Sequence, residues 1–370
     1  MSSTPSVTKQ RKATVNPKAA LIVAAFAAFL ATFNETFLNV GFAPIMADLN
    51  VDVSTVQWLA TAYMLGATVM VPVSAFAYRS FPTRPLFCAT TALLVAGSVV
   101  GALAADFTVL VIGRIIQALG TGMLIPIGMN ITLEVAPREK LGSYMGIMGA
   151  MTTLGPSSSV ILAGAILAFA NWHMLLWVFG GLSLLCCLSG AILLRDIAHL
   201  THPRLDAASV AFIGIALIGM LYGISTVFVA DIAIAVGTIV VGVIFGVLFV
   251  RRQGTLKEPL INLRPLRVPA FAIGTIVNML SLIAIFAMNI IVQTYMQSVL
   301  GTEPLVASLI LFPAILCSCV ASWWACSRSW ASAWRCGFAR KGKASTQWLL
   351  PTHRLMRLRK RSQAPHWLPS

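Results

Sequence analysis

Two charged residues stand inside apolar runs of the sequence, and they are the strongest candidates for chemistry. Arg114 lies in the run that follows Asp106, and Glu35 lies in the first run, before Ala43. Arg114 is eight residues from Asp106 and Glu35 is eight residues from Ala43, and these two helix ends are expected on the same side of the membrane. Both side chains therefore sit about 12 Å below the same membrane boundary. A charge in apolar surroundings usually needs a partner or a water-filled cavity. We therefore expect Arg114 to contact Glu35.

This pair has two interpretations. In the functional one, Glu35 binds and releases a proton while Arg114 tunes its affinity for that proton. In the structural one, the two residues form an inert ion pair, or Glu35 is simply hydrated near the interface. The residues alone leave both open.

Further polar and small residues within apolar runs could serve either packing or transport. Asn278 and Asn289 are eleven residues apart and Gln293 follows Asn289 by four, so the three share one helix face. Such a face either bonds to neighbouring helices or lines a substrate cavity. Gly155 and Pro156 similarly predict either close helix packing or a conformational hinge.

Other chemistries find no support in the sequence. It contains no Gly-rich phosphate loop followed by Lys and Ser or Thr, so we expect no ATP-driven activity. No zinc-type His or Cys spacing appears, and we expect no metal site and no cofactor. The seven Cys match no disulfide framework, so we expect free thiols.

The elements that position these residues follow from composition. The chain has 370 residues, of which 58% are hydrophobic and only 10% charged, and its mean hydropathy is +0.87. This composition is typical of a protein that lives in a lipid bilayer. The net charge of +15 falls between apolar runs rather than on a water-exposed face, so we expect no nucleic-acid partner.

Ten apolar runs are long enough to cross a bilayer, which takes roughly 20 residues each. We therefore expect an all-α, polytopic membrane helix bundle of about ten transmembrane helices. The predicted spans are Ala19–Ala43, Thr55–Tyr78, Leu86–Ala104, Thr108–Thr132, Gly142–Phe169, Met174–Leu194, Ala208–Phe228, Ala233–Val250, Ala270–Thr294 and Leu305–Trp324.

Basic residues fix the expected orientation. If the N-terminus is inside, all of the 26 Lys and Arg except Arg114 fall in inner segments or the tail, and the outer loops carry none. This asymmetry follows the positive-inside rule. We expect a multi-pass protein of the inner cell membrane with both termini cytoplasmic. A cleaved signal peptide is the alternative for the first span, but no convincing cleavage site precedes Pro44.

The character of the sequence changes near its end. Six of the nine Trp lie beyond Val320, with ten basic residues and no acidic one. Residues 317–370 are either a basic, Trp-rich segment that binds a membrane surface or nucleic acid, or a disordered tail translated out of its original frame.

The sequence resembles the major facilitator superfamily, in particular its fourteen-helix drug:proton antiporter branch. The best match is Gly113-Arg114-Ile-Ile-Gln117-Ala-Leu-Gly120-Thr-Gly122, which is similar to that branch's fourth-helix motif. Gln57-Trp58 with Tyr63 is similar to the start of its second helix, and Glu258-Pro259-Leu260 to the loop that opens its second half.

The resemblance implies a secondary active transporter, not an enzyme, that exchanges protons for small amphipathic drugs and needs only a proton gradient. Arg114 would be the proton-coupling arginine, with Asn34 and Glu35 in the first-helix motif. Gln117 would belong to the substrate cavity with the polar face of the ninth span. Gly120 and Gly122 would belong to the hinge with Gly155 and Pro156.

Three departures from the family pattern stand out. Asn34 occupies the position that normally carries Asp, and Glu35 is one residue further on, which turns its carboxylate about 100° away. Ser159 and Val160 replace a second Gly-Pro in the fifth helix. The inner loop from Arg79 to Pro85 lacks the usual Gly and Asp.

The expected organisation is a basic N-terminus (1–18), a first six-helix bundle (19–194), a cytoplasmic loop with two extra helices (195–250), the start of a second bundle (251–316) and the tail (317–370). Such a chain ends two helices into the second bundle, whereas alternating access rocks one half against the other. A truncated, non-transporting membrane protein is therefore the main alternative, and a membrane-embedded enzyme is a weaker one.

Overall fold

A computed structural model describes residues 16–196, 206–226 and 232–256, with scattered positions between 269 and 320. The described part contains helices and no strands, which confirms the all-helical prediction. Their bounds are α1 Pro17–Phe37, the 3₁₀ turn η1 Leu38–Gly41, α2 Phe42–Leu49, α3 Val53–Val56, α4 Trp58–Ser80, α5 Thr83–Ala102, α6 Phe107–Val135, the 3₁₀ turn η2 Arg138–Lys140, α7 Leu141–Leu167, α8 Trp172–Leu193, α9 Ala207–Thr226 and α10 Ile232–Thr255.

Eight helical segments in the described residues are long and apolar enough to cross a membrane, and they coincide with the first eight predicted spans. The ninth and tenth predicted spans lie largely outside the described residues. The largest differences are at the first span, which continues to Leu49, and the eighth, which continues to Thr255.

The first span is interrupted rather than straight. The 3₁₀ turn η1 separates α1 from α2, and Pro44 follows it in the first turn of α2. Proline has no N–H to bond to the carbonyl of Val40, and its ring crowds that carbonyl, so the α-helix tightens here. Asn50 then ends α2 in the left-handed conformation, with φ of 50°, which Asn tolerates better than most residues.

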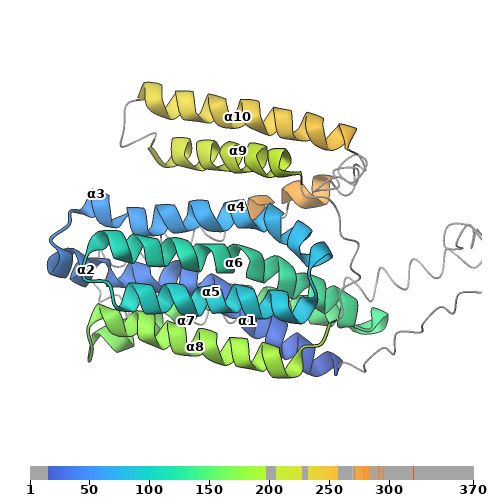
Figure 1. Ribbon diagram of the computed structural model, residues 1–370, viewed down its shortest axis with the longest axis horizontal. Helices are drawn as coiled ribbons and strands as arrows, with labels where there is room; N and C mark the ends of the chain where they lie inside the picture. Colours follow the sequence, from blue (N-terminus) through green and yellow to red (C-terminus); the bar gives the residue numbers. More distant parts are fainter. Residues whose placement is uncertain are drawn as a thin grey trace, which may run out of the picture.

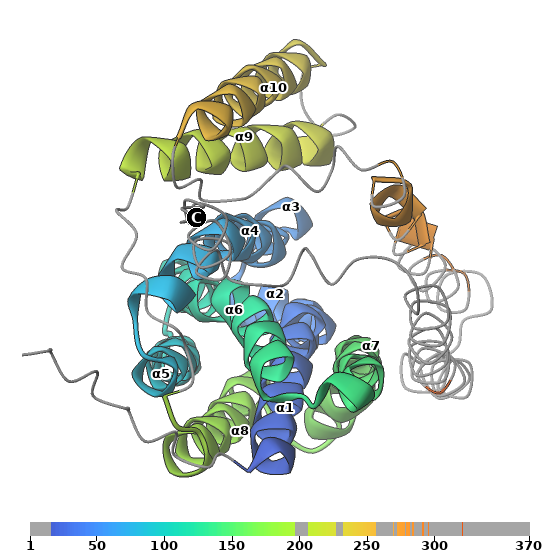
Figure 2. The ribbon, with the colours of Figure 1, turned by 90° about the vertical axis from the view of Figure 1, so that its right-hand side faces the viewer.

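Helix α1 lies inside the bundle, surrounded by α6, α7 and α8 (Figures 1 and 2). Its alanines make this possible because small side chains let neighbouring helices approach closely. The fully buried alanines of α1 are Ala20, Ala24, Ala27, Ala28 and Ala31. Helix α5 packs between α6 and α8, while α4 covers α6 on the other side.

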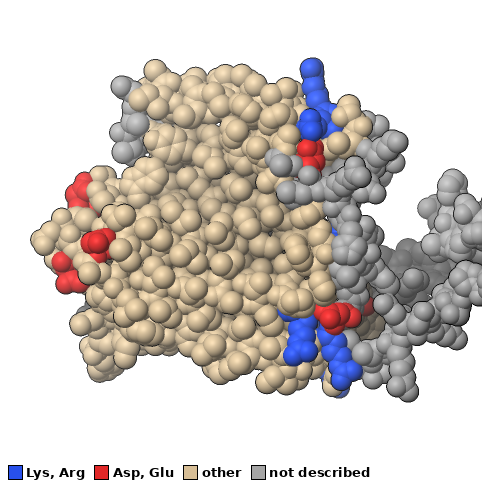
Figure 3. Space-filling view, viewed as in Figure 1, with Lys and Arg blue, Asp and Glu red and all other residues tan. Residues whose placement is uncertain are grey.

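Charged side chains gather at the two ends of the described bundle and leave an uncharged band between them (Figure 3). Basic side chains appear at one end only, the end where α4 and α10 finish and α5 begins. The band matches the apolar layer of a bilayer. Many large apolar side chains within it are exposed, including Ile192, Ile224 and Ile234, as expected for surfaces that face lipid rather than water.

Helices α9 and α10 form a separate hairpin that packs against α4 (Figure 2). Gly219 of α9 faces Gly242 of α10 with no side chain between the two backbones. At one end of the hairpin, the rings of Trp58 on α4 and Tyr222 on α9 lie 6.1 Å apart.

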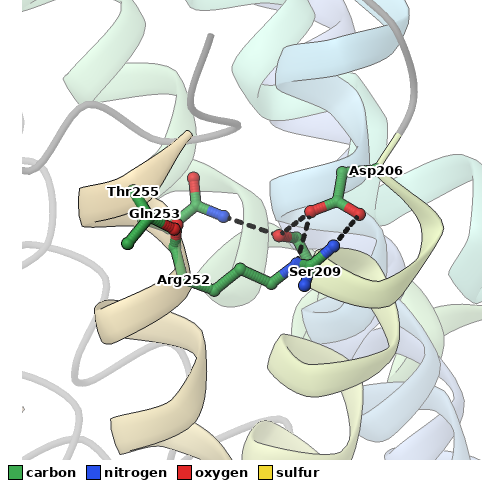
Figure 4. A network of polar contacts seen from close by, with 5 residues as sticks. All are labelled: Asp206, Ser209, Arg252, Gln253 and Thr255. Carbon is green, nitrogen blue, oxygen red and sulfur yellow. Dashed lines mark hydrogen bonds and ion pairs between the residues drawn. The ribbon is translucent and has the colours of Figure 1, made fainter. Parts of the chain in front are cut away.

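An ion pair closes the other end of the hairpin (Figure 4). Arg252 donates from Nε to Oδ2 of Asp206 at 2.7 Å and from a terminal nitrogen to Oδ1 at 2.9 Å. Ser209 donates to the same carboxylate, and Gln253 donates to Ser209 at 2.9 Å. Hydrogen bonds from Arg252 and Ser209 hold the pKa of Asp206 well below its ordinary range.

Replacing Arg252 with Gln is expected to weaken the hairpin, whereas Arg251→Gln at the preceding residue leaves it intact. The pKa of Asp206 is lower in the folded chain than in the unfolded one, so the pair stabilises the fold above about pH 4 and loses its effect as pH falls further. Thermal unfolding in detergent between pH 3 and 7 measures this. Equal unfolding curves for the two variants would contradict the assignment.

Candidate functional site

The predicted proton-coupling arginine is buried in the middle of the six-helix part of the chain. Arg114 lies on α6 with 1% of its surface exposed, one of the largest fully buried side chains. One terminal nitrogen of its guanidinium donates to the backbone oxygen of Asn34 at 3.3 Å and to the side-chain oxygen of Asn34 at 3.0 Å. The same nitrogen donates to Oε1 of Gln117 at 3.0 Å. Helices α1 and α6 are thus joined at this charge.

The hydrogen bonds continue from Arg114 into neighbouring helices. Gln117 donates from Nε2 to the hydroxyl of Ser98 on α5 at 2.9 Å. Asn34 donates from Nδ2 to the hydroxyl of Thr121 at 3.5 Å, and Thr121 donates back to the carbonyl of Gln117 at 3.0 Å. All five side chains are buried, so α1, α5 and α6 share one polar network inside an apolar bundle. We call Asn34, Ser98, Arg114, Gln117 and Thr121 the buried polar network.

The expected contact between Arg114 and Glu35 is wrong in this conformation. No ion pair within 4.0 Å joins them in the described chain, where Arg252 and Asp206 make the pair that is found. Consecutive residues on a helix point about 100° apart, so when Asn34 faces Arg114 its neighbour turns away. Glu35 is only partly buried and lies near enough for its charge to act on Arg114.

An aromatic ring from α4 lies over the guanidinium. The central carbon of the Arg114 guanidinium lies 4.1 Å from the centroid of the Tyr63 ring. Cations over aromatic faces at this distance are attracted by the ring quadrupole. The other two guanidinium nitrogens, Nε and NH2, have no hydrogen-bond partner among the described residues. The charge is therefore held by neutral groups and one ring face.

Glycines set how closely the helices around Arg114 approach. A Cβ added to Gly122 would run into the carbonyl oxygen of Ala67 on α4. On the α5 side, a Cβ on Gly120 would lie 2.5 Å from the carbonyl oxygen of Thr90, and one on Gly113 would lie 2.8 Å from the backbone nitrogen of Gly101. The glycines of the fourth-helix motif are therefore required for packing. Their predicted role in a hinge stays a prediction.

Helix α7 meets α1 beside the buried polar network. A Cβ on Gly155 would collide with the Thr32 side chain, and Pro156 stands within α7. Ser159, one of the departures from the family pattern, shares a 2.6 Å hydrogen bond with Thr36 of α1. Gly155 and Pro156 thus lie at the α1–α7 crossing, and their bending during a cycle remains a prediction.

The structure brings together three of the predicted site residues, Asn34, Arg114 and Gln117. The predicted cavity residues Asn278, Asn289 and Gln293 lie outside the described residues, so they stay predictions, as does a cavity role for Gln117. No group of three or more His, Cys, Asp or Glu gathers to hold a metal ion in the described ranges.

Sequence reasoning missed Ser98 and Thr121, and it named Tyr63 only through a resemblance. Ser and Thr in apolar helices commonly bond to their own backbone, as Ser98 does with Leu94. A second bond to another helix leaves no signal in the sequence. The spacing of Gln117 and Thr121, four apart on one face of α6, was the available hint.

Replacing Ser98 with Ala is expected to destabilise the chain by about 1–2 kcal/mol, because the Gln117 amide loses its buried acceptor. Ser183→Ala is the matched control, since the Ser183 hydroxyl is buried without a partner in the described residues. It should be neutral or slightly stabilising. Thermal unfolding in one detergent compares the two, and an equal loss for both would contradict the network.

Comparison with known proteins places this arrangement in a family. The sequence profile described as Major Facilitator Superfamily matches residues 24–339. The chain is 32% identical over 291 residues to the lincomycin resistance protein LmrB of Bacillus subtilis, covering 78% of this chain and 61% of that protein. It is 25% identical to a multidrug resistance protein B homolog of Mycobacterium tuberculosis, covering 79% of this chain and 55% of that protein.

The fold is also that of a solved transporter. The structure of the proton:xylose symporter XylE is similar with a TM-score of 0.55 and 14% identity, over 84% of this chain and 68% of that one. The curated relatives above are longer, and the chain spans about three fifths of their length. On the family profile, the relatives and the shared fold together, this chain belongs to the major facilitator superfamily.

Proposed function

We propose that the chain is a secondary active transporter that exports small amphipathic compounds in exchange for protons, and that the helices around Arg114 form its first bundle. The observation that carries the proposal is Arg114, a charge buried at a helix crossing with two of its nitrogens unpartnered in the described chain. A buried charge inside a membrane protein is expensive and marks an ion or substrate pathway more often than a structural contact.

The relatives support the class of substrate. Relatives of the chain bear the names lincomycin resistance protein and multidrug resistance protein B homolog. We infer lincomycin-like and amphipathic cationic compounds as substrates, with the proton gradient as the energy source and no cofactor, ATP or nucleic acid involved. Glu35, partly buried and close to Arg114, is the group that we propose to take up and release the proton.

The charge pattern supports the location. Basic side chains of the described helices gather at one end of the bundle (Figure 3), and this end faces the cytoplasm in most membrane proteins. We propose that the chain lies in the bacterial cell membrane with its N-terminus in the cytoplasm.

Transport by the full chain in proteoliposomes tests the proposal. Under an imposed pH gradient, wild-type vesicles are expected to accumulate ethidium or lincomycin, and a protonophore is expected to stop it. The alternative, a non-transporting membrane protein, predicts stable insertion with no accumulation under any gradient.

Glu35→Gln separates the proton relay from a structural role. The variant keeps the size of the side chain but cannot carry a proton, so we expect it to lose accumulation against a gradient while it still binds the probe. Glu139→Gln, at the inner end of the bundle, is the control that should transport normally. Full uphill transport by Glu35→Gln would remove Glu35 from the mechanism.

A further inference from the structure

The ring of Tyr63 occupies the place beside Arg114 where a counter-ion is expected. Tyr63 is 2% exposed, and its ring centroid is 4.1 Å from the guanidinium carbon. No carboxylate lies within 4.0 Å of Arg114 among the described residues. The other contacts of the guanidinium are hydrogen bonds from one nitrogen to neutral oxygens of Asn34 and Gln117.

The packing of α4 on α6 fixes the ring in that place. Arg114, Ala118 and Gly122 follow one another at four-residue spacing and form one face of α6. On α4, Gly66 lies against Ala118 and Ala67 lies against Gly122. On α4, Tyr63 lies about one helical turn before Gly66 and Ala67. On α6, Arg114 lies about one turn before Ala118. The crossing therefore places the guanidinium carbon over the ring.

A ring and a carboxylate hold a cation in different ways. A carboxylate would bond to the guanidinium nitrogens in the plane of the group, whereas a ring covers the face and leaves that plane open. Nε and NH2 of Arg114 have no partners among the described residues. A side chain held in this way keeps its charge in the apolar interior and its in-plane donors available.

We propose that Tyr63 is a positioning residue for Arg114: its ring face holds the guanidinium over α4 so that Nε and NH2 stay available for an acceptor that arrives during the cycle. The expected effect of Tyr63 on transport rests on the proposed function, whereas the contact between Tyr63 and Arg114 does not depend on it. The Tyr63 hydroxyl lies near the side chains of Asn34 and Thr121, whereas the contact with the guanidinium is made by the ring.

The geometry is tested without transport. In the full chain with ¹⁵N-labelled arginine in lipid nanodiscs, Arg114→Lys identifies the Arg114 Nε–H signal. A proton held over an aromatic face is shifted upfield, so wild-type Arg114 is expected to lie upfield of the other arginines. Tyr63→Phe should keep this shift and Tyr63→Leu should abolish it. Tyr78→Leu, which removes another buried tyrosine of α4, should leave it unchanged.

The consequence is tested by transport in proteoliposomes. Tyr63→Leu is expected to lower proton-driven uptake by roughly tenfold or more and to change its pH profile, while Tyr63→Phe rescues both. A wild-type Arg114 signal without an upfield shift overturns the proposal even if Tyr63→Leu fails to fold. Wild-type uptake in Tyr63→Leu also overturns it. An upfield signal in a chain that transports nothing contradicts the proposed function and leaves the positioning contact in place.

Discussion

Arg114→Gln is expected to abolish proton-driven transport while the protein still inserts and folds. The variant removes the only buried charge of the network, and with it the group that we propose to respond to proton binding. Three hydrogen bonds to Asn34 and Gln117 are lost. Two nitrogens of this buried charge have no partner among the described residues. The cost of burying the charge is recovered when it is removed, so the net change in stability stays within about 2 kcal/mol.

Arg114→Lys is expected to fail almost as completely. Lysine keeps the charge, but its ammonium is a point charge that cannot lie over the Tyr63 ring and reach Asn34 and Gln117 together. We expect uptake to fall by more than about tenfold, which corresponds to about 1.4 kcal/mol. Uptake is measured in proteoliposomes at equal protein content.

Arg84→Gln is the matched control, because Arg84 is an exposed arginine at the start of α5. It is expected to transport as the wild type does. If Arg114→Gln also kept wild-type uptake, Arg114 would be a structural residue and the proposed mechanism would be lost.

Gly122→Ala is expected to be strongly damaging, because the added methyl group meets backbone rather than a side chain. The new Cβ would run into the backbone carbonyl of Ala67, which cannot move aside as a flexible side chain would. Helix α4 must then shift away from α6, at a cost of about 3 kcal/mol or more. The shift also withdraws Tyr63 from Arg114, so both stability and transport are expected to fall.

Gly149→Ala is the control for this change. A Cβ at Gly149 on α7 meets nothing within 4 Å, and Ala favours a helix over Gly by about 1 kcal/mol. Gly149→Ala should therefore be neutral or stabilising. Thermal unfolding of both variants in one detergent gives the comparison, and a Gly122→Ala protein as stable as the wild type would contradict the close crossing of α4 and α6.

Much of the fold follows from the sequence because membrane spans are long and strongly apolar. The predicted second span, Thr55–Tyr78, differs from the observed one by two residues at each end. Interruptions are harder to predict. Pro44 near the end of the first span was recognised as a boundary, but the chain tightens into a 3₁₀ turn before it and then continues as α2.

The site was predicted in part. The fourth-helix motif gave Arg114 and Gln117, and the first-helix motif placed Asn34 on the family's carboxylate position. Matched depth suggested Glu35 as the contact of Arg114, but depth alone does not determine which face of α1 a residue occupies. The 100° turn between Asn34 and Glu35 decided that Asn34 meets Arg114. Tyr63 and Ser98 come from other helices, and their contacts depend on crossings that no local pattern specifies.

If Arg114 couples protons to substrate, movement of the substrate must drive movement of protons. Proteoliposomes that contain the full chain and an internal pH-sensitive dye are given a lincomycin gradient with no initial pH difference. We expect wild-type vesicles to move protons opposite to the lincomycin and Arg114→Gln vesicles not to move them. Lincomycin movement without proton movement in the wild type, or equal proton movement in Arg114→Gln, would contradict it.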